Sequence, residues 1–295
     1  MLECRRDFPV RLTSIMRHPI LALALGFIAV GAPVWAAPSV ERGEYLVQGP
    51  AGCGNCHTPI GPQGFDMARD LSGRLVDKNQ AFTAIAPNIT PAGRIAGWSD
   101  VELARAIREG IRPDGSLIGS PMPFTMYRGL GDEDLTSIVM YLRGVPAVAG
   151  DPGKSEYAIP LPPAYGPPVA SVTPPPPGVT VEYGAYLAGP ISHCMECHTP
   201  MGPEGPLVGT RLGAGGFEFA GPWGVSVAAN LTNGPDGLAE YADDQIKAMI
   251  TEGKRPDGSA MHPPMPYPYL AKMTPEDLDA IILYLRSLPA LPDVE

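Results

Sequence analysis

The sequence is poor in basic residues and has no apolar run long enough to span a membrane. Lysine and arginine number 21 against 31 aspartates and glutamates, so the formal net charge is −10. Such a chain is a poor partner for a phosphate backbone, which argues against nucleic-acid binding. The apolar run Ile20–Val30 is shorter than the roughly 20 residues that a transmembrane helix needs. The charge and hydropathy therefore favour neither a nucleic-acid-binding protein nor a membrane-spanning one.

Glycine and proline are abundant, with 35 and 37 residues in a chain of 295. This content approaches the level at which disorder becomes a candidate. However, 44% of the residues are hydrophobic, and they fall into patches with helical spacing. The length suffices for one large domain or for two of about 100–150 residues. We therefore predict loop-rich globular domains.

The N-terminus has the order of a secretory signal peptide. Basic residues precede the apolar run, which ends in "APVWAAP" with small or compact residues at Val34 and Ala36. This order predicts that residues 1–36 are removed and that the mature protein lies in the periplasm. A start at Met16 would satisfy the same pattern. The alternative is an uncleaved membrane anchor, which the short run and Pro33 disfavour.

The second half of the chain repeats the first. "DVELARAIREGIRPDGS" from Asp100 aligns with "DDQIKAMITEGKRPDGS" from Asp243, at an offset of 143 residues. This domain-sized period predicts two domains, residues 37–147 and 180–295, rather than a solenoid. Between them, residues 148–179 form a linker rich in proline, which favours an extended, semi-rigid conformation.

Each half is predicted to be helical, in an all-α fold. Apolar spacing and capping signals place three helices in each half. The predicted ranges are 40–47, 100–109 and 132–143 in the first half, and 181–188, 243–252 and 275–286 in the second. Ser99 and Glu102 fit a capping box. Three short helices with long loops leave too little apolar core, so each half is expected to enclose a large cofactor.

The cysteines outside the leader all lie in two matching stretches, "GCGNCHTP" from Gly52 and "HCMECHTP" from His193. C-x-x-C-H is the attachment signature of c-type haem. Two cysteines would form thioethers with the haem, and the adjacent histidine would bind the iron. The predicted attachment and ligand residues are Cys53, Cys56 and His57 in the first half, and Cys194, Cys197 and His198 in the second.

Three other uses of paired cysteines compete with haem attachment. A redox disulfide does not require the histidine in both copies, and structural disulfides would not explain it. A four-cysteine zinc site usually has its pairs about 15–20 residues apart. The duplicated motif therefore favours two covalently bound haem c groups.

The opposite face of each haem needs its own ligand. A methionine recurs at matching positions in "PMP", at Met122 and Met265, and the flanking prolines stiffen its loop. A thioether is a common second axial ligand in cytochromes c. Met126 is the alternative in the first half, and Met261 or His262 in the second. Asn88 and Asn230 could reach a haem propionate or only shape a turn.

The motifs "NIT…GWSD…PDGS…PMPF…EDL…YLR" resemble those of diheme class I cytochromes c, over about residues 39–147 and 180–290. They are similar to the cytochrome c subunits of periplasmic alcohol, aldehyde and sugar-acid dehydrogenases. Those subunits often carry three haem domains, whereas this chain has two. The resemblance implies two tandem domains, each with a few helices and long loops around one haem. It also places Gly43 with Tyr141, and Gly184 with Tyr284, at the crossing of first and last helices, and packs Tyr45 and Tyr186 beside that crossing.

The resulting hypothesis is a non-catalytic electron carrier, or the electron-transfer subunit of a dehydrogenase complex. It would pass single electrons from a periplasmic dehydrogenase to another cytochrome, an oxidase or another respiratory acceptor. Association with the membrane would be peripheral, through such a partner. The alternative is a diheme redox enzyme, peroxidase-like or thiosulfate-oxidising, with one labile haem. His262 keeps this alternative open.

Overall fold

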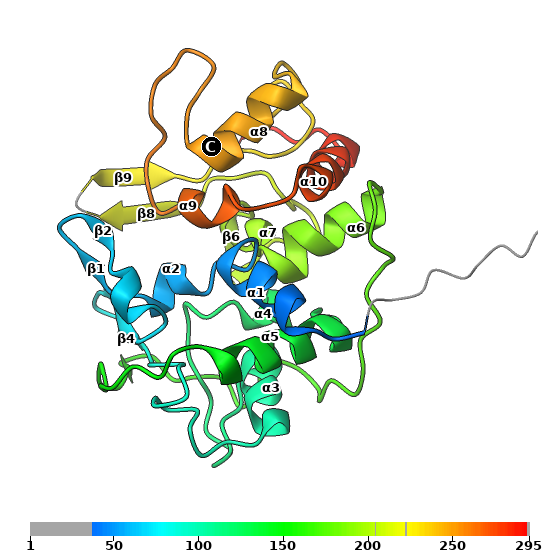
Figure 1. The fold of residues 1–295 in the computed structure, drawn as a ribbon. Helices are drawn as coiled ribbons and strands as arrows, with labels where there is room; N and C mark the ends of the chain where they lie inside the picture. Colours follow the sequence, from blue (N-terminus) through cyan, green and yellow to red (C-terminus); the bar gives the residue numbers. More distant parts are fainter. Residues whose placement is uncertain (1–36, 204, 222, 294–295) are drawn as a thin grey trace, which may run out of the picture. The chain divides into compact units, whose positions relative to one another are not determined.

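The same order of helices occurs twice in the computed structural model, which describes residues 37–203, 205–221 and 223–293 (Figure 1). We call residues 37–147 the first half and residues 180–293 the second half. The predicted signal peptide, residues 1–36, lies outside the described residues. The helices of the first half are α1 (Val40–Gln48), α2 (Gly54–His57), α3 (Asp100–Glu109), α4 (Phe124–Tyr127) and α5 (Asp132–Gly144). Those of the second half are α6 (Val181–Tyr186), α7 (Cys194–Cys197), α8 (Asp243–Glu252), α9 (Tyr267–Leu270) and α10 (Pro275–Ser287).

The long helices begin and end close to their predicted positions, because their caps are local. At the start of α3, the Ser99 hydroxyl accepts a hydrogen bond from the Glu102 amide, and the Glu102 carboxylate accepts one from the Ser99 amide (2.7 Å). This reciprocal pair is the predicted capping box. The exception is α6, which gives way after Tyr186 to a π-helical turn, η2 (Leu187–Ile191). Pro190 lies in this turn and has no amide hydrogen to donate to a regular helix.

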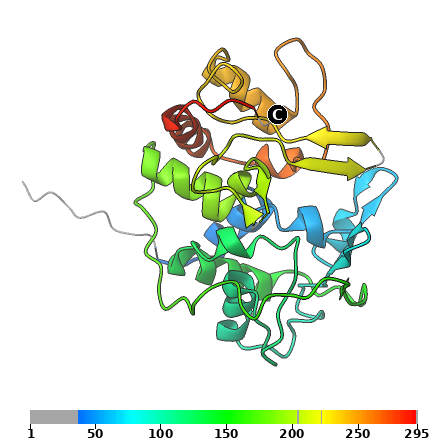
Figure 2. The ribbon, with the colours of Figure 1, turned by 180° about the vertical axis from the view of Figure 1, so that it is seen from behind.

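Short antiparallel strands depart from the predicted all-α fold. The first half contains β1 (Ile60–Gly61) with β2 (Gly64–Phe65), the 3₁₀ turn η1 (Met67–Arg69), and β3 (Arg74–Lys78) with β4 (Phe82–Ala86). The second half contains β6 (Met201–Gly202) with β7 (Gly205–Pro206), and β8 (Glu218–Gly221) with β9 (Gly224–Val227). Figure 2 shows β8 and β9 from behind, as the two yellow arrows. These hairpins occupy the glycine-rich excursions after each cysteine motif. Backbone amides there cannot pair within a helix, so the chain pairs with itself across tight turns.

The first and last helices of each half cross at a glycine, as the resemblance implies. Helix α1 packs on α5, and α6 packs on α10. A β-carbon on Gly43 would lie 1.9 Å from the Ser137 carbonyl oxygen, and one on Gly184 would lie 1.9 Å from the Ala280 carbonyl oxygen. Both would also meet the β-carbon of the facing tyrosine, Tyr141 or Tyr284, at 2.8 Å. Only glycine permits this close approach of the two backbones.

The proline-rich segment between the halves lies along the first half. Its strand β5 (Glu156–Tyr157) adds to β4, and the Asp132 amide donates to the Val172 carbonyl oxygen (2.9 Å). The Tyr165 ring stacks on Phe124 with the ring centroids 4.9 Å apart. The proline-rich segment therefore packs against the first half and is not a free linker between the two halves.

The buried apolar residues of the two halves form one continuous cluster. Leu46, Leu130 and Ile138 of the first half belong to the same cluster as Leu187 and Ile281 of the second. Residues 37–293 accordingly lie within one compact unit. None of the helices in the described part of the chain combines the length and apolar character needed to cross a bilayer.

Candidate functional site

The first cysteine motif folds as a single helical turn that ends at His57, and hydrogen bonds hold this histidine on both its backbone and its ring. The His57 amide donates to the Cys53 carbonyl oxygen (3.0 Å), and the His57 carbonyl oxygen accepts from the Gly73 amide (2.6 Å). The His57 ring is buried, and its Nδ1 lies 2.8 Å from the Pro87 carbonyl oxygen. A carbonyl can only accept, so Nδ1 carries the proton and Nε2 is left with a free lone pair.

The second motif repeats this geometry. The His198 amide donates to the Cys194 carbonyl oxygen (3.0 Å), and the Gly215 amide donates to the His198 carbonyl oxygen (2.9 Å). The buried His198 ring places Nδ1 2.7 Å from the Ala229 carbonyl oxygen. Both histidines are thus fixed in the tautomer that can bind a metal through Nε2.

The loops that supply these carbonyl groups are held by two buried asparagines. Asn88 accepts from the Thr90 amide (2.9 Å) and donates to the Val148 carbonyl oxygen (2.7 Å). Asn230 accepts from the Thr232 amide and donates to the Leu291 carbonyl oxygen, both at 2.9 Å. Their side chains are occupied by backbone groups, so these residues shape turns, the second of the two roles considered from the sequence.

The four cysteines have free thiols in environments that oppose ionisation. Burial raises the pKa of Cys53 to about 12 and that of Cys194 to about 11. Burial also raises the pKa of Cys197 to about 12, and that of Cys56 in the same direction. Redox-active cysteines need a readily formed thiolate. The arrangement is thus unfavourable for a redox disulfide.

The methionine loops of the two halves also match each other. Met122 and Met265 are half-buried against the core cluster. Each begins a tight turn, in which the Phe124 amide donates to the Met122 carbonyl oxygen (2.9 Å) and the Tyr267 amide to that of Met265 (3.0 Å). Among the alternatives, His262 is exposed, whereas Met126 is half-buried like Met122.

Residues 181–289 match the cytochrome c family. This part of the chain is a cytochrome c domain. The chain as a whole is 30% identical to the cytochrome c subunit of a quinone alcohol dehydrogenase from Gluconobacter oxydans, with 96% of this chain and 63% of that protein aligned. It is 28% identical to the fructose dehydrogenase cytochrome subunit of Gluconobacter japonicus, over 86% of this chain and 53% of that one.

A further relative shares only part of the chain. A diheme cytochrome c-type protein of Cereibacter sphaeroides is 37% identical over 129 residues, which are 41% of this chain and 42% of that protein. The chain spans 63% of the length of the first of these longer relatives and 53% of the second. The similarity therefore establishes a cytochrome c domain and leaves the activity of the whole assembly to be inferred.

The cytochrome c domain binds haem c covalently through its C-x-x-C-H motif, and the residues present fit this group. Cys194 and Cys197 have free thiols for two thioether bonds. His198 would bind the iron through Nε2, because its Nδ1 is held by a carbonyl group. The corresponding residues of the first half are Cys53, Cys56 and His57, with the same donor chemistry.

Each cysteine motif contacts the other half of the molecule. The residue before the first cysteine is Gly52, on which a β-carbon would lie 3.5 Å from the β-carbon of Tyr269 in α9. Its counterpart, His193, contacts Tyr127 of α4 edge-on, with the ring centroids 5.9 Å apart. Burial has the largest effect in raising the pKa of Cys197, and Glu196 and Cys56 raise it further. Cys56 of the first motif is therefore close to Cys197 of the second. The two motifs therefore meet at the junction of the halves.

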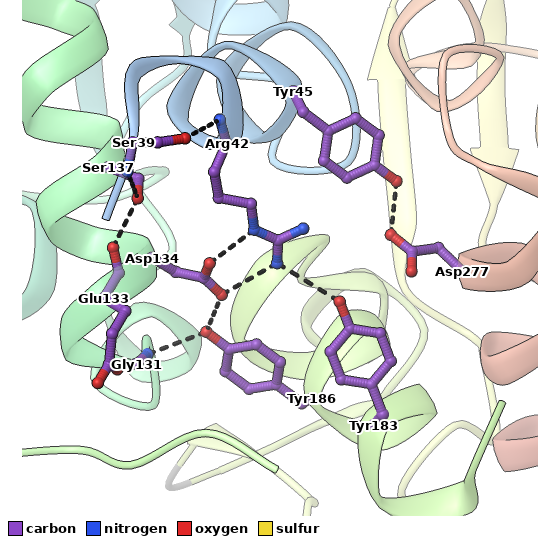
Figure 3. Close-up of polar contacts among 10 residues, drawn as sticks. All are labelled: Ser39, Arg42, Tyr45, Gly131, Glu133, Asp134, Ser137, Tyr183, Tyr186 and Asp277. Atoms are coloured by element: carbon purple, nitrogen blue, oxygen red, sulfur yellow. Dashed lines mark hydrogen bonds and ion pairs between the residues drawn. The ribbon is translucent and has the colours of Figure 1, made fainter. Parts of the chain in front are cut away.

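Two matching tyrosine–aspartate contacts close this junction (Figure 3). The Tyr45 hydroxyl donates to the Asp277 carboxylate (2.5 Å) and accepts from the Thr274 amide (3.2 Å). The Tyr186 hydroxyl donates to Asp134 (2.7 Å) and accepts from the Gly131 amide (3.0 Å). We call these two contacts the tyrosine clasps.

The clasps add to the prediction made for these tyrosines, which packed them on or beside the helix crossing of their own half. Each hydroxyl also reaches the N-terminus of the last helix in the opposite half, where an amide and an acidic side chain are available together. The sequence signal is a tyrosine two residues after the crossing glycine in both halves, with an aspartate in the first turn of both α5 and α10.

The two clasps differ in charge. Arg42 binds Asp134 through two nitrogens (2.7 and 3.2 Å) and lies 3.4 Å from the Tyr183 hydroxyl. At the matching position of the second half is Tyr183 itself, and among the described residues no arginine binds the Asp277 carboxylate. Burial raises the pKa of Asp277, and the Tyr45 hydroxyl opposes that rise. Sequence reasoning did not find this arginine pair, which joins two residues 92 positions apart.

Because His193 is held half-buried as a neutral ring, we expect acid to destabilise the protein through this residue. Burial lowers the pKa of His193 to about 4, below the 6.5 of an exposed histidine. The unfolded chain therefore binds a proton more readily than the folded protein as the pH falls from about 7.5 towards 4.5, which lowers the free energy of unfolding by up to about 2 kcal/mol.

Urea unfolding at about pH 7.5 and at about pH 4.5 should show that this loss of stability is smaller in His193→Asn than in wild type. Asparagine tolerates the positive φ of 43° at this position. An undiminished loss in the variant would contradict the assignment.

Proposed function

We propose that the chain is a periplasmic diheme c-type cytochrome that relays single electrons as part of a dehydrogenase system. The observation that carries this proposal is the pair of cysteine motifs, each with a histidine held through Nδ1, meeting at one junction. Bound haem c supplies a one-electron ferric–ferrous couple. The protein's part is to hold two such groups in fixed relation, so that an electron can enter in one half and leave from the other.

The dehydrogenase partner is inferred from the relatives. The similar proteins are cytochrome subunits of an alcohol dehydrogenase, a fructose dehydrogenase and a gluconate 2-dehydrogenase. A net charge of −10 would complement a basic docking surface on a partner and speed their encounter. The acceptor in this scheme is another cytochrome or an oxidase. A periplasmic location follows from the signal peptide predicted for residues 1–36.

Met122 and Met265 are proposed as the second axial ligands. Each lies half-buried in a turn that matches its counterpart, and thioether ligation favours ferrous iron and raises the potential. With both methionines bound, neither iron would offer a site to a substrate, and the protein would act as a carrier rather than as a peroxidase-like or thiosulfate-oxidising enzyme. His262, the residue that favoured such an enzyme, is exposed and matches Gly119 in the first half.

The test is a count of haem per chain together with the methionine-sulfur charge-transfer band of the ferric protein. We expect two haems per chain and a band that loses about half its intensity in Met122→Ala and in Met265→Ala. Met126→Ala and His262→Ala are matched controls that should leave the band unchanged. A single haem per chain, or a wild-type protein that reacts with peroxide at one haem, would overturn the proposal.

A further inference from the structure

A positive charge lies against the first cysteine motif. Arg74, the first residue of β3, donates from Nη2 to the carbonyl oxygen of Asn55 (2.7 Å) and from Nη1 to that of Leu75 (2.9 Å). Asn55 is one of the two residues between Cys53 and Cys56. The guanidinium is therefore fixed on the loop that would carry the first haem.

This charge is not neutralised by a nearby acid. Within the described ranges, no carboxylate forms an ion pair with Arg74, and its Nε is buried without a hydrogen-bond partner. A charge held in a partly buried site without a counter-ion acts on its neighbours more strongly than one in water. Consistent with this, Arg74 lowers the pKa of both Cys56 and His57, although burial has the largest effect on each.

The second motif lacks this cation. The amides of Gly73 and Gly215 bind the carbonyl groups of the two motif histidines, which fixes the correspondence of the loops. The residue after each glycine is Arg74 in the first half and Gly216 in the second. A glycine carries no charge, so the two sites differ by one positive charge at this position.

The residues between the cysteines also differ in charge. The position occupied by Asn55 in the first motif is occupied by Glu196 in the second, and both directly precede the second cysteine. The matching positions thus hold a cation and a neutral amide in the first half, and a glycine and an acid in the second. Glu196 also acts on Cys56 of the first motif, and Asp70, which accepts from the Thr58 hydroxyl, acts on Cys53. Arg74 is held directly on the backbone of the first motif, 2.7 Å from the Asn55 carbonyl oxygen. It favours electron uptake there, since a nearby cation stabilises the less positive ferrous state.

We propose that Arg74 gives the first half the higher reduction potential and thereby sets the direction of electron flow from the second half to the first. This inference rests on the proposed function, because it requires a haem in each half. A one-electron donor would reduce the second half, that electron would pass to the oxidised first half, and a one-electron acceptor docked there would remove it. Each transfer moves one electron and leaves the second half ready for the next.

The experiment is a potentiometric titration of the holoprotein, followed optically, for wild type and Arg74→Gln. Wild type should show two one-electron waves. In Arg74→Gln the higher wave should move towards the lower one, with about a tenfold loss in the equilibrium constant for electron exchange, equivalent to about 59 mV. Arg74→Lys keeps the charge and should restore most of the separation. Arg69→Gln removes an exposed arginine paired with Asp66 and should change neither wave.

Two further variants keep the outcome interpretable. Asn55→Asp places an acid beside Arg74 and should lower the same wave, which covers the case in which Arg74→Gln fails to assemble. Met122→His should shift the wave that belongs to the first half and so identify it. Two waves unmoved by both Arg74→Gln and Asn55→Asp, or movement of the lower wave alone, would overturn the inference and leave the diheme proposal intact. A single one-electron wave would instead overturn the diheme proposal itself.

Discussion

Gly43→Ala should lower the free energy of unfolding by about 3 kcal/mol, at the upper end of the cost of overpacking a core. The added β-carbon would lie 1.9 Å from the Ser137 carbonyl oxygen. That oxygen belongs to the backbone of α5 and cannot rotate away, so α1 and α5 must move apart. Gly184→Ala should cost about as much, because its β-carbon would lie 1.9 Å from the Ala280 carbonyl oxygen.

Denaturant unfolding of the holoprotein, followed by circular dichroism, measures this effect. Gly144→Ala is the matched control, because Gly144 is the last residue of α5 and a β-carbon there meets nothing within 4 Å. The control should change stability by less than about 1 kcal/mol. If Gly43→Ala were as mild as its control, the two helices would not cross as closely as described.

Asp134→Ala should destabilise the protein more than Asp277→Ala, although the two residues occupy matching positions. Removing the Asp134 carboxylate leaves the half-buried Arg42 guanidinium and the Tyr186 hydroxyl without their acceptor, at a cost of about 3 kcal/mol, the lower end of the range for a buried pair. Asp277→Ala leaves only the Tyr45 hydroxyl without its acceptor, at about 1–2 kcal/mol. The same unfolding measurement distinguishes them.

A double variant isolates the role of the charge. Arg42→Met with Asp134→Asn removes both charges while keeping similar side-chain volumes, and it should recover most of the loss seen in Asp134→Ala. If Asp134→Ala and Asp277→Ala lowered the free energy of unfolding equally, the ion pair of Arg42 would add nothing to the stability that the tyrosine clasps provide. Such a result would contradict the asymmetry of the junction.

The sequence predicts those parts of the fold that depend on near neighbours. Helix α3 is recognisable because Ser99 and Glu102 satisfy each other's amides within four residues. The cysteine motifs are recognisable because haem attachment requires fixed spacing, and the later loops hold their histidines from 30 residues away without changing that spacing.

The missed elements have weaker local signals. The one-turn helices α4 (Phe124–Tyr127) and α9 (Tyr267–Leu270) are too short to show a helical period, and Pro268 obscures the second. The hairpins lie in glycine-rich stretches with little alternation. The junction depends on pairs such as Tyr45 and Asp277, which are 232 positions apart. Nothing in the neighbourhood of either residue specifies its partner.

The reciprocity of the tyrosine clasps carries an evolutionary consequence. Tyr45 binds the acid at the start of α10, and Tyr186 binds the matching acid at the start of α5. Contacts in which residue i meets j, and j meets i, are those of an isologous twofold dimer. Two separate copies of a half-length ancestor would have made both clasps before their genes were joined. The difference between Arg42 and Tyr183 would then have arisen after the fusion. Matching positions are identical in a homodimer, and they can differ once both copies are parts of one chain.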